Sequence, residues 1–291
     1  MKQLTISAGL ILGLVVFSGL ANAQRPGEAP TASDLYCAGF YSAQPVASSM
    51  RILPGETDGF KHEYGTGDTV YLNQGRQAIS SPGTQYLLVR PVKDVNETEF
   101  FPGQNDMIAK LGTQYAEVGR IRVEIVHERS AAARVEMACD PIHAGDIAIP
   151  FETRTASAYK TPRAVADFAP PSGKANGLIV ASREFKHALG EGEIVYLTLG
   201  EAQGVQAGNY LRIFRDPANS NDPLAELNKD YMTEGMGGVS VGHRLTEAEL
   251  ASLPRNVIGE IQILSVRPGT STGIITFSRS EVFTGDSVEL E

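Results

Sequence analysis

The stretch FKHEYGTGDTVYLNQG at residues 60–75 recurs as FKHALGEGEIVYLTLG at residues 185–200, at a constant offset of 125 residues. The two stretches are identical at nine of 16 positions, including the opening Phe-Lys-His, the Gly-x-Gly pair and the Val-Tyr-Leu run. Internal self-similarity at this level indicates a duplicated structural unit. The chain of 291 residues is therefore predicted to contain two copies of one module.

A second pair of similar segments extends the repeat. VGRIRVEIV at 118–126 aligns with IGEIQILSV at 258–266, and this time the offset is 140 residues. The change of offset predicts an insertion of 15 residues in the second copy, between Arg215 and Val257. TEAELASL at 246–253 has Thr and Glu at capping-box spacing, which predicts one short helix there. Because loops carry specificity on a fixed scaffold, we expect functional asymmetry at this insertion.

Each copy has the sequence pattern of short β-strands. Apolar residues alternate with charged ones in segment 118–126, as in a half-buried strand, and Gly-Asp and Pro-Gly pairs supply turns. Short strands at this spacing predict an all-β chain of two tandem small antiparallel β-barrel or sandwich modules, at residues 50–150 and 177–291. Residues 151–176, which contain Pro, Gly and Ser, are predicted to link them.

The N-terminus has the features of an export signal. Lys2 precedes an apolar run from Leu10 to Leu20, and Ala21-Asn22-Ala23 is a signal-peptidase pattern. We predict a cleaved signal peptide at 1–23, a leader or tether at 24–49 and a periplasmic or secreted protein; an uncleaved anchor is the alternative. No later run reaches about 18 apolar residues, so no transmembrane span is expected after cleavage.

The two cysteines are an even pair in a chain predicted to be exported, where disulfides persist. A Cys37–Cys139 bridge closes a long loop and is expected to contribute about 4–5 kcal/mol of stability. The alternative is two buried thiols. Neither cysteine lies in a CxxC pair, which disfavours a redox-active or zinc-binding role.

Charge and motifs exclude several classes of function. With 25 basic and 34 acidic residues the net charge is −9, which disfavours binding to nucleic acid or anionic lipid. The sequence lacks GxSxG, HExxH and P-loop motifs, so we expect neither an enzyme nor a bound cofactor. In DPIHAGD, Asp140, His143 and Asp146 are potential metal ligands, but only the last aspartate recurs in the second copy. A metal site is therefore not expected.

Two repeated residue types are candidate contact residues. His62 and His187 belong to the opening Phe-Lys-His of the repeat, but no nucleophile recurs beside them as an acid–base role would require, so a structural role is favoured over a catalytic one. Tyr71 and Tyr196 lie in the repeated Val-Tyr-Leu run, where they either pack in the core or rim, or contact a partner.

The repeated motif resembles a known family. The pattern G-x-G-[DE]-x-V-Y-L, then a hydrophobic strand ending in VRP or FRDP, then [VI]-G-x-I and Gly-Asp resembles the C-terminal domain of flagellar assembly protein T. Similar domains occur in bacterial envelope proteins that carry LysM modules. The likeness covers residues 62–149 and 187–289. It implies small β-rich periplasmic modules without enzymatic activity that associate with envelope assemblies.

These features together predict an exported, non-catalytic tandem β-module protein. We expect it to act as a scaffold or binding component of a bacterial cell-envelope assembly, with an envelope protein or peptidoglycan as partner. One alternative is a peptidoglycan- or polysaccharide-binding protein, although the absence of Trp reduces the supply of sugar-stacking rings. A second alternative is a hydrolase whose site lies between the modules and takes His, Asp or Glu side chains from both.

Overall fold

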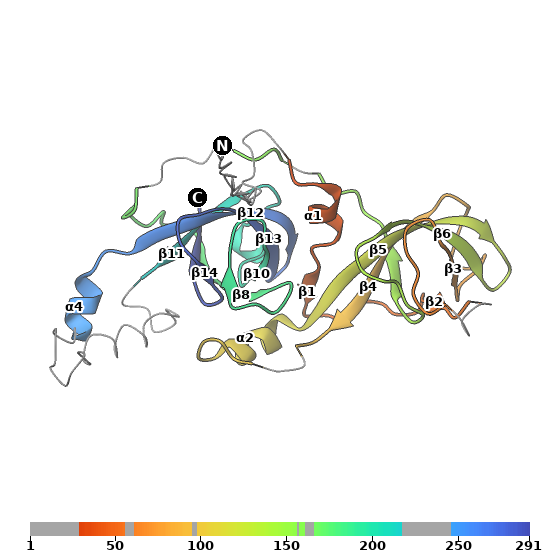
Figure 1. The fold of residues 1–291 in the computed structure, drawn as a ribbon, viewed down its shortest axis with the longest axis horizontal. Coiled ribbons are helices and arrows are strands. Elements are labelled where there is room, and N and C mark those ends of the chain that lie inside the picture. The colour runs from red at the N-terminus through yellow and green to blue at the C-terminus, as the bar shows by residue number, and fades with distance from the viewer. Residues whose placement is uncertain (1–28, 56–60, 95–97, 156, 161–165, 217–245) are drawn as a thin grey trace, which may run out of the picture.

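The chain folds into a curled, barrel-like sheet and a closed β-barrel, here called barrel 1 and barrel 2, with the N-terminal helix between them (Figure 1). The structure is a computed structural model, and it describes residues 29–55, 61–94, 98–155, 157–160, 166–216 and 246–291. The predicted signal peptide and most of the segment that contains the 15-residue insertion lie outside these residues.

Barrel 1 is a curled antiparallel sheet in the order β2-β3-β6-β5-β4-β7. Its strands are β2 (Ile52–Leu53), β3 (Thr69–Leu72), β4 (Gln85–Val92), β5 (Thr113–Val126), β6 (Ala131–Ala138) and β7 (Ile147–Pro150). A backbone bridge between Arg51 and Ile147 joins the two ends of the sheet. The apolar faces of the strands therefore enclose one core, which includes Leu72, Leu88 and Ile121.

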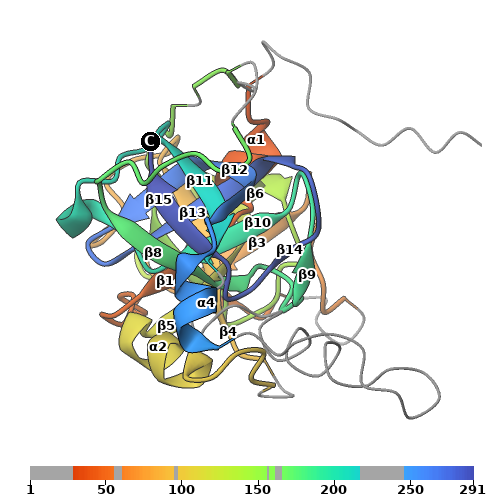
Figure 2. The same cartoon turned by 90° about the vertical axis from the view of Figure 1, so that its left-hand side faces the viewer.

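Barrel 2 is a closed antiparallel barrel in the order β10-β13-β12-β11-β15-β8. Its strands are β8 (Asn176–Ser182), β10 (Ile194–Leu197), β11 (Tyr210–Arg215), β12 (Asn256–Arg267), β13 (Thr270–Ser278) and β15 (Ser287–Leu290). A small sheet of β9 (Ala188–Leu189) and β14 (Val282–Phe283) lies beside it, and the 3-10 helix η1 spans Glu201–Gln203. Figure 2 views the molecule from the barrel 2 end.

The two barrels are structural copies down to their register. Thr69 pairs with Arg134 in barrel 1, and the residues at the repeat offsets, Ile194 and Ile274, pair in barrel 2. The irregularities in β5 and β12 also fall at equivalent positions. The predicted all-β fold of tandem barrel modules is confirmed, because the repeated sequence produces the same strand order and the same bulges.

The repeated glycines have two different backbone roles. Gly67 and Gly192 have φ angles of +91° and +85° in the turns before β3 and β10, a conformation that glycine adopts without steric cost. Gly75 and Gly200 lie against a neighbouring backbone instead, where an added Cβ would come within 2.5 Å and 2.3 Å of a carbonyl oxygen. Each role is therefore shared by two glycines at equivalent positions of the predicted repeat.

The predicted helix of the second module is α4 (Glu247–Ser252). Its capping box is present: the Glu249 amide donates to Thr246 Oγ1 at 3.3 Å, and Thr246 N donates to Glu249 Oε2 at 2.8 Å. Barrel 1 has a helix at the equivalent connection, α2 (Gln104–Leu111), which the sequence analysis missed. Gly103 precedes it and provides no side-chain cap, so the usual start signal is absent.

The N-terminal segment, defined here as Thr31–Ser42, lies between the barrels. It contains α1 (Ala32–Tyr36) and β1 (Phe40–Ser42), and β1 pairs with the start of β5. A disulfide joins Cys37 to Cys139, just after β6, which confirms the predicted bridge. A disulfide of this kind is typical of proteins outside the cytoplasm.

Candidate functional site

A cleft of about 460 Å³ lies between the two barrels. Helix α2 and the end of β4 form one wall, and the end of β8 with the turn that follows it forms the other. The cleft is lined, among others, by Tyr41, Phe100, Gln104, Ile108, Gln114, Ser182, Phe185 and Thr284. Its volume falls within the range of about 300–1,000 Å³ that is usual for ligand sites, and mainly apolar walls with a few polar groups are typical of such sites.

Gln104 joins the two walls of the cleft. Its side chain is almost fully buried, and Nε2 donates to the carbonyl oxygen of Val180 in β8 at 2.8 Å. Its Oε1 accepts a hydrogen bond from the Phe100 amide at 2.7 Å. Both ends of the amide are therefore satisfied, and α2 is fixed directly to barrel 2.

Phe185 has an unusual backbone conformation at the edge of the cleft. Its φ is +56°, and it is the one residue other than glycine with positive φ among those described. The Ser182 side chain holds this turn, because Ser182 Oγ accepts from the Lys186 amide at 2.8 Å. Strained conformations of this type, which cost on the order of 1–3 kcal/mol, concentrate at functional sites.

The two repeated histidines have different surroundings. The His187 ring stacks between Phe100 and Phe283, with centroid distances of 4.8 Å and 4.9 Å, and Nδ1 shares a 2.8 Å hydrogen bond with Thr284 Oγ1. His62 is exposed on barrel 1, and its carbonyl oxygen lies 3.0 Å from His143 Nδ1. His187 thus packs behind the cleft at the junction of the barrels, whereas His62 lies on a turn.

The two repeated tyrosines also differ. Tyr196 is completely buried, makes an edge-to-face contact with Tyr41 at 5.1 Å and donates from its hydroxyl to the carbonyl oxygen of Ala38 at 2.8 Å. Burial raises the pKa of Tyr196 well above its ordinary value. Tyr71 is half-buried in barrel 1. The partner of Tyr196 is therefore the N-terminal segment of its own chain.

The stability of the junction should depend on pH through His187. Burial, and then the positive charge of Arg215, lower the pKa of His187 below 6.5, so the folded state favours the neutral ring. As pH falls below about 6.5, the unfolded chain binds this proton before the folded one does, and stability declines until the lowered pKa is passed. Urea unfolding between pH 7.5 and 5 should show this decline, and His187→Gln should reduce it. An unchanged pH dependence in the variant would contradict the prediction.

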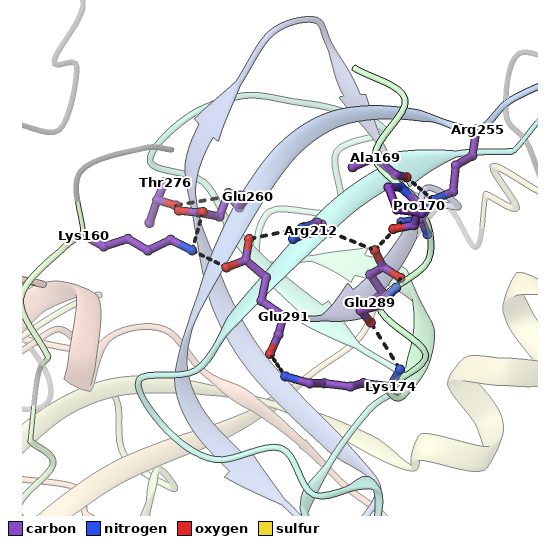
Figure 3. A network of polar contacts seen from close by, with 11 residues as sticks. Lys160, Ala169, Pro170, Lys174, Arg212, Arg255, Glu260, Thr276, Glu289 and Glu291 are labelled. Carbon is purple, nitrogen blue, oxygen red and sulfur yellow. Dashed lines mark hydrogen bonds and ion pairs between the residues drawn. The ribbon is translucent and has the colours of Figure 1, made fainter. Parts of the chain in front are cut away.

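A second polar cluster fastens the connector to the outside of barrel 2 (Figure 3). Lys160 forms ion pairs with Glu260, at 2.7 Å, and with Glu291, while Arg255 binds Glu289 and donates to the Ala169 carbonyl oxygen at 2.9 Å. Burial raises the pKa of Glu260, and Lys160 opposes that shift. These buried carboxylates have cationic partners from the same chain, so the cluster has a structural role.

The charged side chains near the cleft pair with one another. Lys186 pairs with Glu184 at 2.6 Å and with Glu193 at 2.9 Å. Within the described ranges, no group of three or more His, Cys, Asp or Glu side chains is placed to hold a metal ion. In the DPIHAGD turn, Asp146 is bound by Arg90 at 2.7 Å.

Sequence analysis missed most of the cleft. Phe100 and Gln104 have no counterpart in the repeat and carry no motif. Phe185 had a signal, because the repeat aligns it with Phe60. Its role at the cleft depends on where the second barrel packs against the first.

Comparisons with known proteins identify no family to which the chain can be assigned. In the described part of the chain, no helix has both the length and the apolar character needed to cross a membrane. No protein-family model matches the chain, and no curated protein matches its sequence.

Proposed function

We propose that the protein is an exported, non-catalytic binding or scaffold component of a bacterial cell-envelope assembly, and that the cleft between the barrels holds its partner. The observation that carries the proposal is the cleft itself, a mainly apolar space that neither barrel forms alone. The signal-like N-terminus and the disulfide support export to an oxidising compartment. The resemblance of both modules to the terminal domain of flagellar assembly protein T supports an envelope role.

The chemistry of the cleft favours binding over hydrolysis. A hydrolase between the barrels would need His, Asp or Glu side chains from both of them. Of the described residues that line the cleft, one is a carboxylate, Asp94, and none is a histidine. Its polar residues are mainly amides and hydroxyls, which orient a ligand by hydrogen bonds. An apolar segment of an envelope protein is the partner that these walls fit best.

A photo-reactive residue placed in the cleft tests this proposal in intact cells. Asn105 is exposed and lines the cleft, whereas Ile125 is exposed on β5 of barrel 1 and is not a lining residue, so it is the matched control position. We expect cross-linking to a defined envelope protein from position 105 and not from position 125. Cross-linking to glycan, together with enrichment on isolated peptidoglycan, would favour the polysaccharide alternative. No envelope partner from either position would refute the proposal.

Phe185 offers a sharper variant for the same experiment. Phe185→Gly removes the ring but adopts positive φ without steric cost, so the turn should keep its conformation. We expect reduced cross-linking from position 105 with unchanged thermal stability or a small gain. Full cross-linking in this variant would mean that the Phe185 wall of the cleft does not contact the partner.

A further inference from the structure

Several contacts bind the N-terminal segment to barrel 1, and three of them involve residues 37–42. Cys37 is joined to Cys139 by the disulfide. The Gly39 amide donates to Glu117 Oε2 at 3.1 Å, and this carboxylate is almost fully buried. The short strand β1 then pairs with β5, with Phe40 opposite Tyr115. The disulfide is the only covalent contact of the three.

Three successive carbonyl groups of the same segment are bound by side chains of barrel 2. Arg183 donates to the carbonyl oxygen of Cys37 at 3.4 Å, and the Tyr196 hydroxyl donates to that of Ala38 at 2.8 Å. Thr272 Oγ1 donates to the carbonyl oxygen of Gly39 at 3.0 Å. The backbone from Cys37 to Gly39 therefore bridges the barrels directly.

Gly39 shows how closely the three parts are packed. Its φ is +73°, and a Cβ added there would lie 2.7 Å from the Tyr115 carbonyl oxygen of barrel 1 and 2.7 Å from the Tyr196 hydroxyl of barrel 2. No side chain fits between these two atoms without a shift of backbone or of a buried tyrosine. A displacement of the N-terminal segment would therefore change the contact between the barrels.

The same segment supplies part of the cleft. Tyr41 lines the cleft and donates from its hydroxyl to Gln114 Oε1 at 2.9 Å. It also packs edge-to-face on Tyr196. Displacement of the segment would remove Tyr41 from the wall of the cleft. It would also separate Tyr41 from Tyr196, a contact that now connects the segment to barrel 2.

We propose that the Cys37–Cys139 disulfide is a redox-sensitive latch for the junction between the barrels. Cys139 is partly exposed, so a thiolate can reach the bond from solvent, whereas Cys37 is buried. A dithiol reductant attacks one sulfur, forms a mixed disulfide and is released as its own disulfide, leaving two cysteine thiols; two electrons and two protons are transferred. Reduction leaves the segment attached to barrel 1 by the pairing of β1 with β5, by Glu117, and by Arg154, whose backbone amide donates to the Tyr36 hydroxyl at 2.9 Å. The junction then loosens at residues 37–39 while each barrel stays folded. This inference depends on the fold and not on the identity of any cleft partner.

Hydrogen exchange on the full mature chain, with and without a dithiol reductant, tests the latch. We expect amide protection in residues 38–42 to fall by at least about tenfold on reduction, while protection in the core strands of both barrels is retained. The double variant Cys37→Ser/Cys139→Ser should show the same loss without reductant. Unchanged protection in residues 38–42 would overturn the proposal, and so would loss of protection throughout either barrel.

Two glycine-to-alanine variants test the role of the junction separately from that of the disulfide. Gly39→Ala keeps both cysteines but cannot fit between Tyr115 and Tyr196, so it should reproduce the loss of protection in the oxidised protein. Gly83→Ala is the matched control, because Gly83 has a φ of +90° and nothing within 4 Å of an added Cβ. The control should leave residues 38–42 protected. Equal protection in the two variants would overturn the assigned role of the segment.

Discussion

Replacement of Asp286 by alanine should destabilise barrel 2 by about 3–5 kcal/mol, because it leaves a largely buried guanidinium without its anion. Arg215 donates from Nε to Asp286 Oδ1 at 2.7 Å and from its second terminal nitrogen to Oδ2 at 2.9 Å. The carboxylate is completely buried and also accepts the Phe283 amide at 2.7 Å. The substitution thus removes an ion pair and a turn hydrogen bond together.

The repeat supplies a matched variant in barrel 1. Arg90 binds Asp146 in the same bidentate geometry, and these hydrogen bonds raise the pKa of Arg90 above its ordinary value. The Arg90 side chain is 31% exposed, against 13% for Arg215, so water can partly replace the lost anion. Asp146→Ala should therefore destabilise barrel 1, by less than Asp286→Ala destabilises barrel 2.

An exposed ion pair serves as the control for both variants. Lys61 and Asp68 are 2.7 Å apart but have side chains that are 45% and 31% exposed. Asp68 Oδ2 also accepts the Gly65 amide at 2.7 Å, so Asp68→Ala removes an exposed ion pair and a turn hydrogen bond and should cost about 1–2 kcal/mol. Urea unfolding followed by far-UV circular dichroism gives the free energies, and hydrogen exchange assigns each loss to one barrel. If Asp286→Ala were as mild as Asp68→Ala, the buried pair would not have the expected stabilising role.

Tyr196→Ala should cost about 3–5 kcal/mol, as expected for the loss of a large buried aromatic side chain. The substitution opens a cavity beneath Tyr41 and leaves the Ala38 carbonyl oxygen without its 2.8 Å donor. Tyr196→Phe keeps the ring and removes only the hydroxyl, and a loss of about 1–3 kcal/mol is expected for the unpaired acceptor. Both effects should appear in the unfolding free energy of the oxidised protein.

Tyr71→Ala is the matched control at the equivalent position of the repeat. Tyr71 is half-buried in barrel 1, so its removal leaves no closed cavity and should cost clearly less than Tyr196→Ala. Comparable losses at the two positions would show that the stability effect comes from the Val-Tyr-Leu strand itself. A large difference would locate it in the contact between barrel 2 and the N-terminal segment.

Much of the fold was predictable because its signals are local or repeated. Alternation of apolar and charged residues near Ile121 defines a strand, and the turn glycines Gly67 and Gly192 mark where strands begin. The capping residues Thr246 and Glu249 mark a helix in the same way. Helix α2 escaped prediction because its N-cap is Gly103, which provides no side-chain acceptor.

The candidate site was less predictable, for a physical reason. His62 and His187 occupy equivalent positions in the repeat, but one is exposed and the other stacks on Phe100 from the opposite barrel. The contrast arises from packing between segments far apart in the chain, and such packing leaves no periodic pattern in either segment. The cleft depends on the same contacts.

The sequence by itself determined that the chain is a duplicated β-structure, because its strands and turns depend on neighbouring residues that recur at fixed offsets. The capped helix α4 depends on neighbouring residues too, whereas α1 was not predicted although Thr31 and Asp34 form a capping box. The sequence also indicated the Cys37–Cys139 bridge, because two cysteines allow one intramolecular pairing. Tertiary structure decided that the N-terminal segment lies between the barrels, that Tyr196 is buried while Tyr71 is not, and that a cleft forms at the junction. These features arise when two similar surfaces meet a third segment that is not repeated, and shape complementarity among the three determines which copy of each residue is buried.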